Sequence, residues 1–200
     1  MISLYIKCLK NKSINRFAII FRLLVIAVSL GFLNVYASES IDRRLQISLS
    51  IFPKIVAVDN GLREKLDKKN RVLLAFISEF DDGKARELAK AMRSKIKNIA
   101  GMSYRVEPVN LGDILAKDSF SPTAIFLTER LSSKRFNTVM DFAMRKKILV
   151  FSPFTGDVER GATVGIAITS RVKPYFNMRT LGASSISINA LLIKMSKRYE

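Results

Sequence analysis

The sequence predicts a single layered α/β domain with a mostly parallel central sheet, helices on both faces, and a C-terminal edge hairpin followed by a helix. Three observations predict this class. Short continuous apolar runs recur along the chain, helical segments lie between them, and the last third changes to alternating extended segments. Residues 38–200 are also long enough for one domain with a substantial core.

The first predicted element is a helix over residues 45–56, where the apolar residues mix helical and alternating spacing. Pro53 is expected to kink or end this helix, because proline has no N–H for the preceding turn. A turn at residues 59–61 and a polar, lysine-rich connector over 62–70 come next.

Residues 72–77 form the first continuous apolar run, which is typical of a strand buried on both faces of a parallel sheet. A helix over residues 85–97 follows, and its acidic start and basic end suit the helix dipole. Later elements are a strand at 104–109, a short helix at 111–117, a strand at 122–127, a helix at 136–147 and a strand at 148–151. We expect the three apolar runs to be neighbouring strands.

The last third of the chain has a different pattern. Two extended segments, 164–168 and 173–178, are separated by a short polar turn and could pair as an edge hairpin. An amphipathic helix is then expected to close the chain, with an apolar face made of Ile186, Leu191, Leu192 and Met195.

Residues 1–37 have the three parts of a secretory signal peptide: a basic start, an apolar core and a small-residue exit that ends at Ala37. The uninterrupted apolar core has 11 residues, whereas a membrane-spanning helix needs about 20. We therefore expect cleavage near Ala37 and a periplasmic domain over residues 38–200. The alternative is an inner-membrane anchor over residues 18–35, which would bury Arg22 at a cost of a few kcal/mol.

The residue types that remain after cleavage exclude several chemistries. The chain has no histidine and no tryptophan, and its one cysteine, Cys8, lies in the signal region. A Ser-His-Asp triad, a Cys-His pair, a disulfide and a zinc site of the usual ligands are therefore excluded. Asp81 and Asp82 follow the first buried strand, and we interpret them as a helix start rather than as catalytic carboxylates. An enzyme that uses a Ser-Lys dyad or a carboxylate pair stays open as a third hypothesis, although neither shows a recognisable motif. We expect no catalytic residues, no metal and no cofactor.

The charge balance points to an anionic partner. Five of the 34 basic residues and none of the 17 acidic residues lie in the first 37, which leaves the mature chain at +12. An acidic protein face or a membrane surface would suit this charge, and export makes nucleic acid the weakest of the three. The basic residues are scattered, so ordinary solvated lysine is an equally good explanation.

The loop over residues 152–161 is the most unusual segment. It leaves the third buried strand with two glycines, one proline and three charged residues. Ligands of open α/β sheets settle at the carboxyl ends of the strands, so the loop could hold a ligand. It could also be an ordered turn that leads into the hairpin. Phe154, with Tyr175 and Phe176, could line an apolar binding surface or belong to the core.

The residues after this loop resemble the YfiR/HmsC-like family of exported bacterial proteins. The likeness rests on the glycine before an alternating strand at 161–168, the basic extended segment with Asn177, Leu181-Gly-Ala-Ser, and the closing Leu-Leu helix. It covers about residues 148–199. It implies a periplasmic α/β domain that binds the sensor region of an inner-membrane diguanylate cyclase and keeps cyclic-di-GMP and biofilm output low. Family members commonly carry disulfides and a Trp-Pro pair, and this chain has neither, with Phe52-Pro53 a loose counterpart.

The function that these observations predict is a non-enzymatic periplasmic domain that binds and controls an inner-membrane signalling protein, such as a diguanylate cyclase. The alternative is a periplasmic small-ligand-binding protein that uses loop 152–161. Contact with a membrane surface and a homodimer are left open, and nucleic acid is not expected as a partner. The residues expected to bind the partner are Phe154 as apolar anchor, with Asp157, Arg160, Lys173 and Tyr175 around it.

Overall fold

The computed structural model describes residues 41–116 and 120–200, so the predicted signal peptide and its cleavage site lie outside the described residues. The chain divides between Arg43 and Arg44, and the fold given below is that of the unit that begins at Arg44. In the described part of the chain, no helix is both long and apolar enough to cross a membrane.

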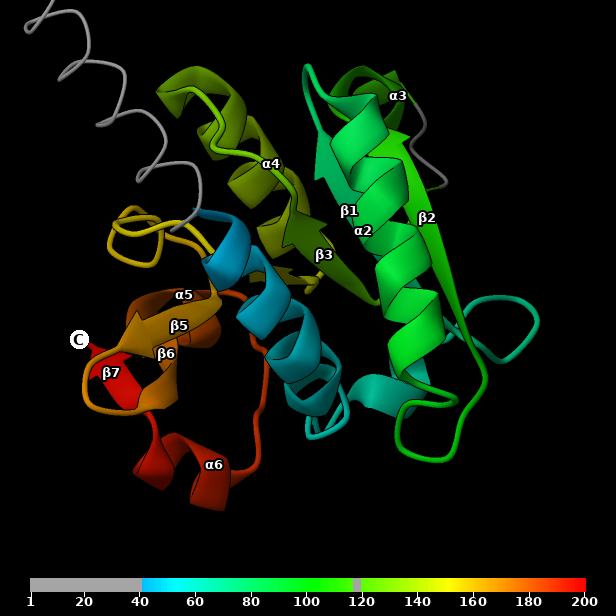
Figure 1. Cartoon of the computed structure of the whole chain (residues 1–200). Coiled ribbons are helices and arrows are strands. Elements are labelled where there is room, and N and C mark those ends of the chain that lie inside the picture. Colours follow the sequence, from blue (N-terminus) through cyan, green and yellow to red (C-terminus); the bar gives the residue numbers. More distant parts are fainter. Residues whose placement is uncertain (1–40, 117–119) are drawn as a thin grey trace, which may run out of the picture. The chain divides into compact units, whose positions relative to one another are not determined.

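One sheet of seven strands forms the centre of this unit, in the order β2-β1-β3-β4-β5-β6-β7 (Figure 1). The strands are β1 Val72–Ser78, β2 Tyr104–Asn110, β3 Ala124–Leu127, β4 Leu149–Phe151, β5 Val164–Ile168, β6 Val172–Asn177 and β7 Lys197–Tyr199. Strands β1 to β5 are mutually parallel, β6 runs antiparallel to β5, and β7 runs parallel to β6. The predicted mostly parallel sheet, with β1, β3 and β4 as neighbours, is confirmed.

Helices cover both faces of this sheet, as predicted. The helices are α2 Asp82–Lys95, α3 Leu111–Ala116, α4 Ser133–Arg145, α5 Met178–Ala183 and α6 Ala190–Met195, with a 3-10 turn η1 at Leu62–Lys65 and a first helix over residues 44–56. The first helix and α2 lie side by side and share one core with the sheet (Figure 1). Helices α3 and α4 share the second core, on the opposite face.

The central strands are apolar at every position because both of their faces are covered. Leu74 and Phe76 of β1 belong to the first core, whereas Ala75 and Ile77 belong to the second. All four are 0% exposed. Side chains alternate across a strand, so a strand between two helical layers reads as a continuous apolar run.

Pro53 does not end the first helix, which reaches residue 56 as predicted. The helix continues to residue 56, and the carbonyl oxygen of Pro53 accepts a hydrogen bond from the N–H of Ala57 at 2.9 Å. A proline inside a helix costs about 3 kcal/mol. Burial of Leu49, Phe52 and Ile55 on the inner face of the helix outweighs this cost, at about 1.5–3 kcal/mol for each side chain.

The C-terminal segment also differs from the prediction. The helix is shorter than expected, has no buried residue, and excludes Ile186, which lies before it in the core. Strand β7 then pairs with β6, so the β5–β6 hairpin lies one strand inside the sheet edge. Pairing with β6 gives hydrogen-bond partners to backbone N–H and C=O groups of the last residues. At a frayed helix end, these groups would be hydrogen-bonded only to water.

Candidate functional site

A pocket of about 240 Å³ opens at the carboxyl ends of β4 and β5, the edge of the sheet where α/β proteins bind ligands. Loop 152–161 forms one wall, and β5, β6 and β7 supply the others. The lining residues are Arg44, Phe154, Thr155, Gly156, Val158, Glu159, Ile166, Ala167, Ile168, Thr169, Tyr175 and Lys197. Apolar side chains therefore make much of the wall, with four ionisable groups among them.

Asp157 organises loop 152–161 from the inside. Its Oδ2 accepts a hydrogen bond from Ser152 Oγ at 2.6 Å, and its Oδ1 pairs with Arg160 Nη1 at 2.9 Å. Its side chain is 0% exposed. Asp157, which was predicted to bind a partner, is therefore not on the surface of the loop. Its role is to hold the loop, because a buried charge must be paired and hydrogen-bonded.

The loop is also fixed to the elements that follow it. Asn177 Nδ2 donates to the carbonyl oxygen of Val158 at 2.7 Å, and Thr180 Oγ1 donates to that of Gly161 at 3.0 Å. At Gly165, a Cβ atom would lie 2.7 Å from the carbonyl oxygen of Ser152, so only glycine allows this approach. The segment is thus an ordered turn that also forms a pocket wall, and its role in holding a ligand stays a prediction.

Arg44 joins the loop to β5. Its Nε donates to the carbonyl oxygen of Pro153 at 2.8 Å, and its Nη2 donates to that of Ile166 at 3.0 Å. Burial lowers the pKa of the Arg44 guanidinium, because the charged form loses hydration. The first helix, through Arg44, therefore places a half-buried positive charge in the pocket wall.

Tyr175 carries the polar part of the opposite wall. Burial raises the pKa of its hydroxyl, and the negative charge of Glu159 raises it further. The ammonium of Lys197 on β7 lies 4.3 Å from the centroid of the Tyr175 ring, a cation–π contact. Tyr175 thus links the acidic and the basic side chain on this side of the pocket.

The structure brings together two of the five residues predicted to bind a partner. Phe154 and Tyr175 both line the pocket. Lys173 is exposed on β6, outside the lining. Arg160 is also outside it, because its guanidinium is paired with Asp157 and lies 4.3 Å from the ring centroid of Phe136.

Three charged residues of the pocket were missed by the sequence analysis: Arg44, Glu159 and Lys197. Glu159 lies in the loop that was singled out, so its position could have suggested it. The hydrogen bonds of Arg44 go to Pro153 and Ile166, which lie 109 and 122 positions later in the chain. A local sequence pattern cannot predict contacts over such separations. Lys197 reaches the pocket through the unexpected strand β7.

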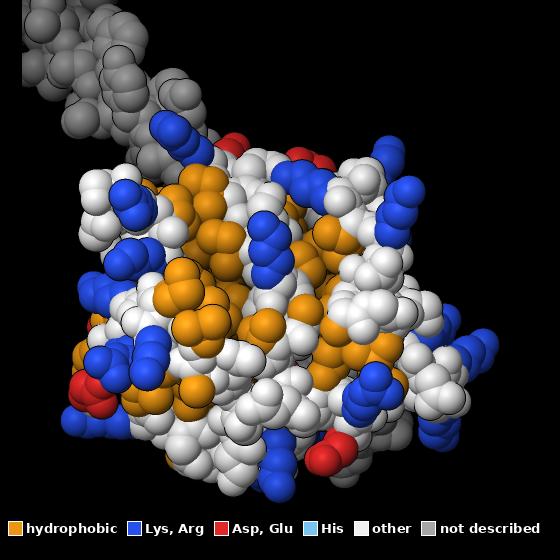
Figure 2. Space-filling model, turned by 90° about the horizontal axis from the view of Figure 1, so that it is seen from below, with side chains coloured by type: hydrophobic (Ala, Val, Ile, Leu, Met, Phe, Trp, Pro, Cys, Tyr) orange, Lys and Arg blue, Asp and Glu red, His pale blue; other side chains and the backbone are white. Residues whose placement is uncertain are grey.

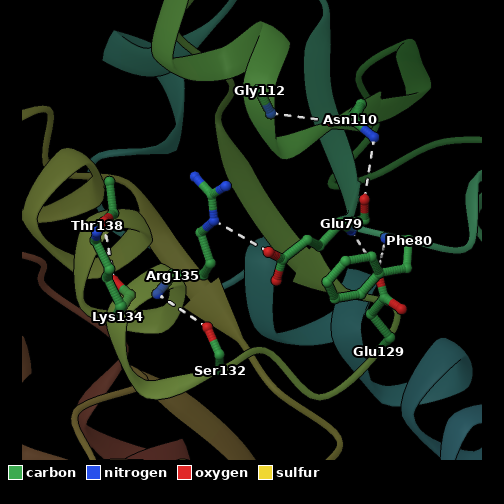
Figure 3. Close-up of polar contacts among 9 residues, drawn as sticks. All are labelled: Glu79, Phe80, Asn110, Gly112, Glu129, Ser132, Lys134, Arg135 and Thr138. Carbon is green, nitrogen blue, oxygen red and sulfur yellow. Dashed lines mark hydrogen bonds and ion pairs between the residues drawn. The ribbon is translucent and has the colours of Figure 1, made fainter.

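A second polar cluster lies at the carboxyl ends of β1 and β3, where the strand order reverses. Glu129 Oε1 accepts hydrogen bonds from the backbone N–H groups of Glu79 and Phe80, the second at 2.8 Å. Arg135 Nε pairs with Glu79 Oε1 at 3.0 Å. Figure 3 shows Glu129 and Arg135 approaching Glu79 and Phe80 from different sides. The carboxylate of Glu129 thus occupies the backbone donors that an anionic ligand would need at this point.

The adjacent Asp81 is a helix cap, as the sequence predicted. Its Oδ1 accepts a hydrogen bond from the N–H of Lys84 at 2.8 Å, at the start of α2. Over residues 41–116 and 120–200, no group of three or more histidine, cysteine, aspartate or glutamate side chains is placed to hold a metal ion. We take the pocket beside loop 152–161 as the candidate functional site because it lies at the carboxyl ends of β4 and β5.

No family model matches the chain, and no curated protein matches it. Among solved structures, it is similar to the ABC domain in complex with L-Trp from Streptococcus pneumonia, at 13% identity and TM-score 0.45, over 72% of this chain and 60% of that one. A conserved domain protein from Vibrio cholerae matches at 14% identity and TM-score 0.46, over 68% and 57%. A ligand-free, open substrate binding protein with adhesive properties from Clostridium difficile matches at 15% identity and TM-score 0.48, over 70% and 57%. The chain thus spans less than two thirds of each of these structures.

Proposed function

We propose that this protein is a periplasmic small-ligand-binding protein, and that its ligand occupies the pocket beside loop 152–161. The observation that carries the proposal is the pocket itself, about 240 Å³ in volume and walled by a loop that internal hydrogen bonds hold in place. Small-ligand sites are typically concave and preformed, with a few polar groups that orient the ligand.

Two further features support this proposal. The wall combines apolar side chains such as Phe154 and Ile166 with the polar groups of Arg44, Glu159 and Lys197. The signal-peptide pattern of residues 1–37 supports the periplasmic location. Binding without catalysis also agrees with the absence of histidine from the whole sequence and of cysteine after residue 8.

The proposal predicts that filling the pocket abolishes ligand binding. Ala167 lines the pocket on β5 and is half-buried, so Ala167→Leu would occupy ligand space. A library of small metabolites, screened by the thermal midpoint of unfolding, should contain compounds that raise the midpoint of the wild-type protein. A ligand present at 100 times its Kd stabilises the folded state by about 2.7 kcal/mol. Ala167→Leu should lose this increase.

The matched control is Ser170→Leu, which adds a leucine at an exposed hairpin position outside the pocket lining. It should keep the ligand-induced increase in full. If the compounds that stabilise the wild-type protein stabilise Ala167→Leu equally, they bind elsewhere and the proposed site is wrong. If no compound stabilises the wild-type protein, the small-ligand function is contradicted.

A second candidate function is the regulatory one, in which the domain binds an inner-membrane signalling protein such as a diguanylate cyclase. It is favoured by helix α6, where Leu191 is 67% exposed and Met195 is 65% exposed. Figure 2 shows apolar side chains in several patches on the face seen from below, among many lysine and arginine side chains. Apolar contact framed by basic residues would suit an acidic protein surface.

A site-specific crosslink tests the regulatory candidate. A photo-crosslinking residue at position 191 should capture an inner-membrane protein in the native cell, because Leu191 would lie in the interface. The same residue at position 90, an exposed site on α2, should not capture it. Equal capture at both positions, or capture at neither, would count against a specific interface at α6.

A further inference from the structure

We propose that the pocket beside loop 152–161 selects a small organic anion, a carboxylate that carries an apolar ring or chain. This inference rests on the proposed ligand-binding function and adds the class of ligand. The pocket volume is about 240 Å³, whereas a dry cavity of about 150 Å³ already accommodates benzene. The space is therefore sufficient for one ring and one carboxylate group.

The first argument is the unbalanced charge of Arg44. Its two hydrogen bonds go to carbonyl oxygens of Pro153 and Ile166, and no carboxylate of the described residues forms an ion pair with it. Carbonyl dipoles orient a guanidinium but do not neutralise it. A half-buried positive charge without a counter-ion is costly, and a ligand carboxylate in the pocket would supply that counter-ion.

The second argument concerns the other charged groups of the lining. Lys197 lies over the Tyr175 ring, with no carboxylate of the described residues paired to it. The one carboxylate of the lining is that of Glu159, which is exposed. The lining thus has two positive groups and one negative group, a net charge of one positive. The remaining positive potential favours an anion.

The surroundings of the pocket add to this potential. Arg171 and Lys173 are exposed on the β5–β6 hairpin, next to the lining residues of β5. Exposed charges of one sign raise the local concentration of the oppositely charged ligand at low ionic strength. The apolar part of the ligand would contact Phe154, Val158 and Ile166, which line the same pocket.

Three probes of nearly equal size and different charge test the ligand class: phenylacetate, phenylethanol and phenethylammonium. Calorimetric titration of the full-length protein at low salt should give a dissociation constant for phenylacetate at least about ten-fold lower than for the other two, because hydrogen bonds between charged groups are roughly twice as strong as those between neutral groups. Lys197→Gln should reduce this preference without abolishing it, because Arg44 still supplies one positive group. Lys197→Glu, which reverses the net charge of the lining, should shift the preference toward phenethylammonium. Lys194→Gln, at an exposed lysine of α6 outside the lining, should change nothing.

The outcomes separate this inference from the proposed function. If phenylethanol binds as tightly as phenylacetate and Ala167→Leu abolishes both, the pocket binds ligands but does not select anions, and the inference is overturned. If Lys197→Gln and Ala167→Leu leave phenylacetate binding unchanged, the anion binds elsewhere and the inference is also overturned. If none of the probes binds, the inference fails, while the library screen decides independently whether the pocket is a ligand site.

Discussion

Leu74→Asp is expected to abolish the folded state. Leu74 is 0% exposed in β1, and its neighbours in the sheet are Val106 of β2 and Ala124 of β3. Its side chain lies in the first core, which consists of apolar side chains. An unpaired carboxylate there costs several kcal/mol, out of a total stability of about 5–15 kcal/mol for a domain.

Urea unfolding followed by circular dichroism measures this effect. The wild-type protein should show one cooperative transition, and Leu74→Asp should show none. Leu191→Asp makes the same chemical change at a leucine that is 67% exposed, so its stability should remain within about 0.5 kcal/mol of wild type. A cooperative transition of Leu74→Asp near the wild-type midpoint would contradict the buried position of β1.

Phe52→Ala is expected to leave a folded but much less stable protein. Phe52 lies on the first helix, and its ring centroid is 6.2 Å from that of Phe76, 5.3 Å from Phe126 and 5.5 Å from Phe151. One side chain thus connects the helix to three adjacent strands. Truncation removes these contacts and leaves a cavity, at a cost of about 3–5 kcal/mol.

The measurement is again the free energy of unfolding from urea titration, with an unchanged dependence on urea concentration. Phe80→Ala is the matched control, because Phe80 is 83% exposed and its loss should cost less than about 0.5 kcal/mol. A loss below about 1 kcal/mol for Phe52→Ala would mean that the aromatic cluster does not hold the first helix on the sheet.

The aromatic cluster also explains why the first helix continues past Pro53. Pro53 follows Phe52 directly, and local rules make proline a helix terminator. Local rules do not include the burial of Phe52 against three strands, which is available only once the sheet is assembled. Where tertiary packing of one helix face is this extensive, it outweighs the local preference of a single residue.

The strand β7 illustrates the same limit at the other end of the chain. Residues 197–199 are Lys-Arg-Tyr, which carries no apolar alternation. They become a strand because the edge of β6 presents unpaired backbone groups to them. Backbone pairing is nearly independent of side-chain type, so a sequence pattern does not predict it.

The sequence by itself determined the layered α/β class, the neighbouring buried strands β1, β3 and β4, the β5–β6 hairpin, and loop 152–161 as the segment of interest. These features follow from hydrophobic periodicity and turn residues, which act over a few neighbouring positions. Only the tertiary structure decided that Asp157 is buried inside the loop, and that Arg44 and Lys197 meet Tyr175 around one pocket. The reason is physical: a pocket is made by residues from distant parts of the chain, and their meeting depends on how the sheet and helices pack together rather than on any local preference.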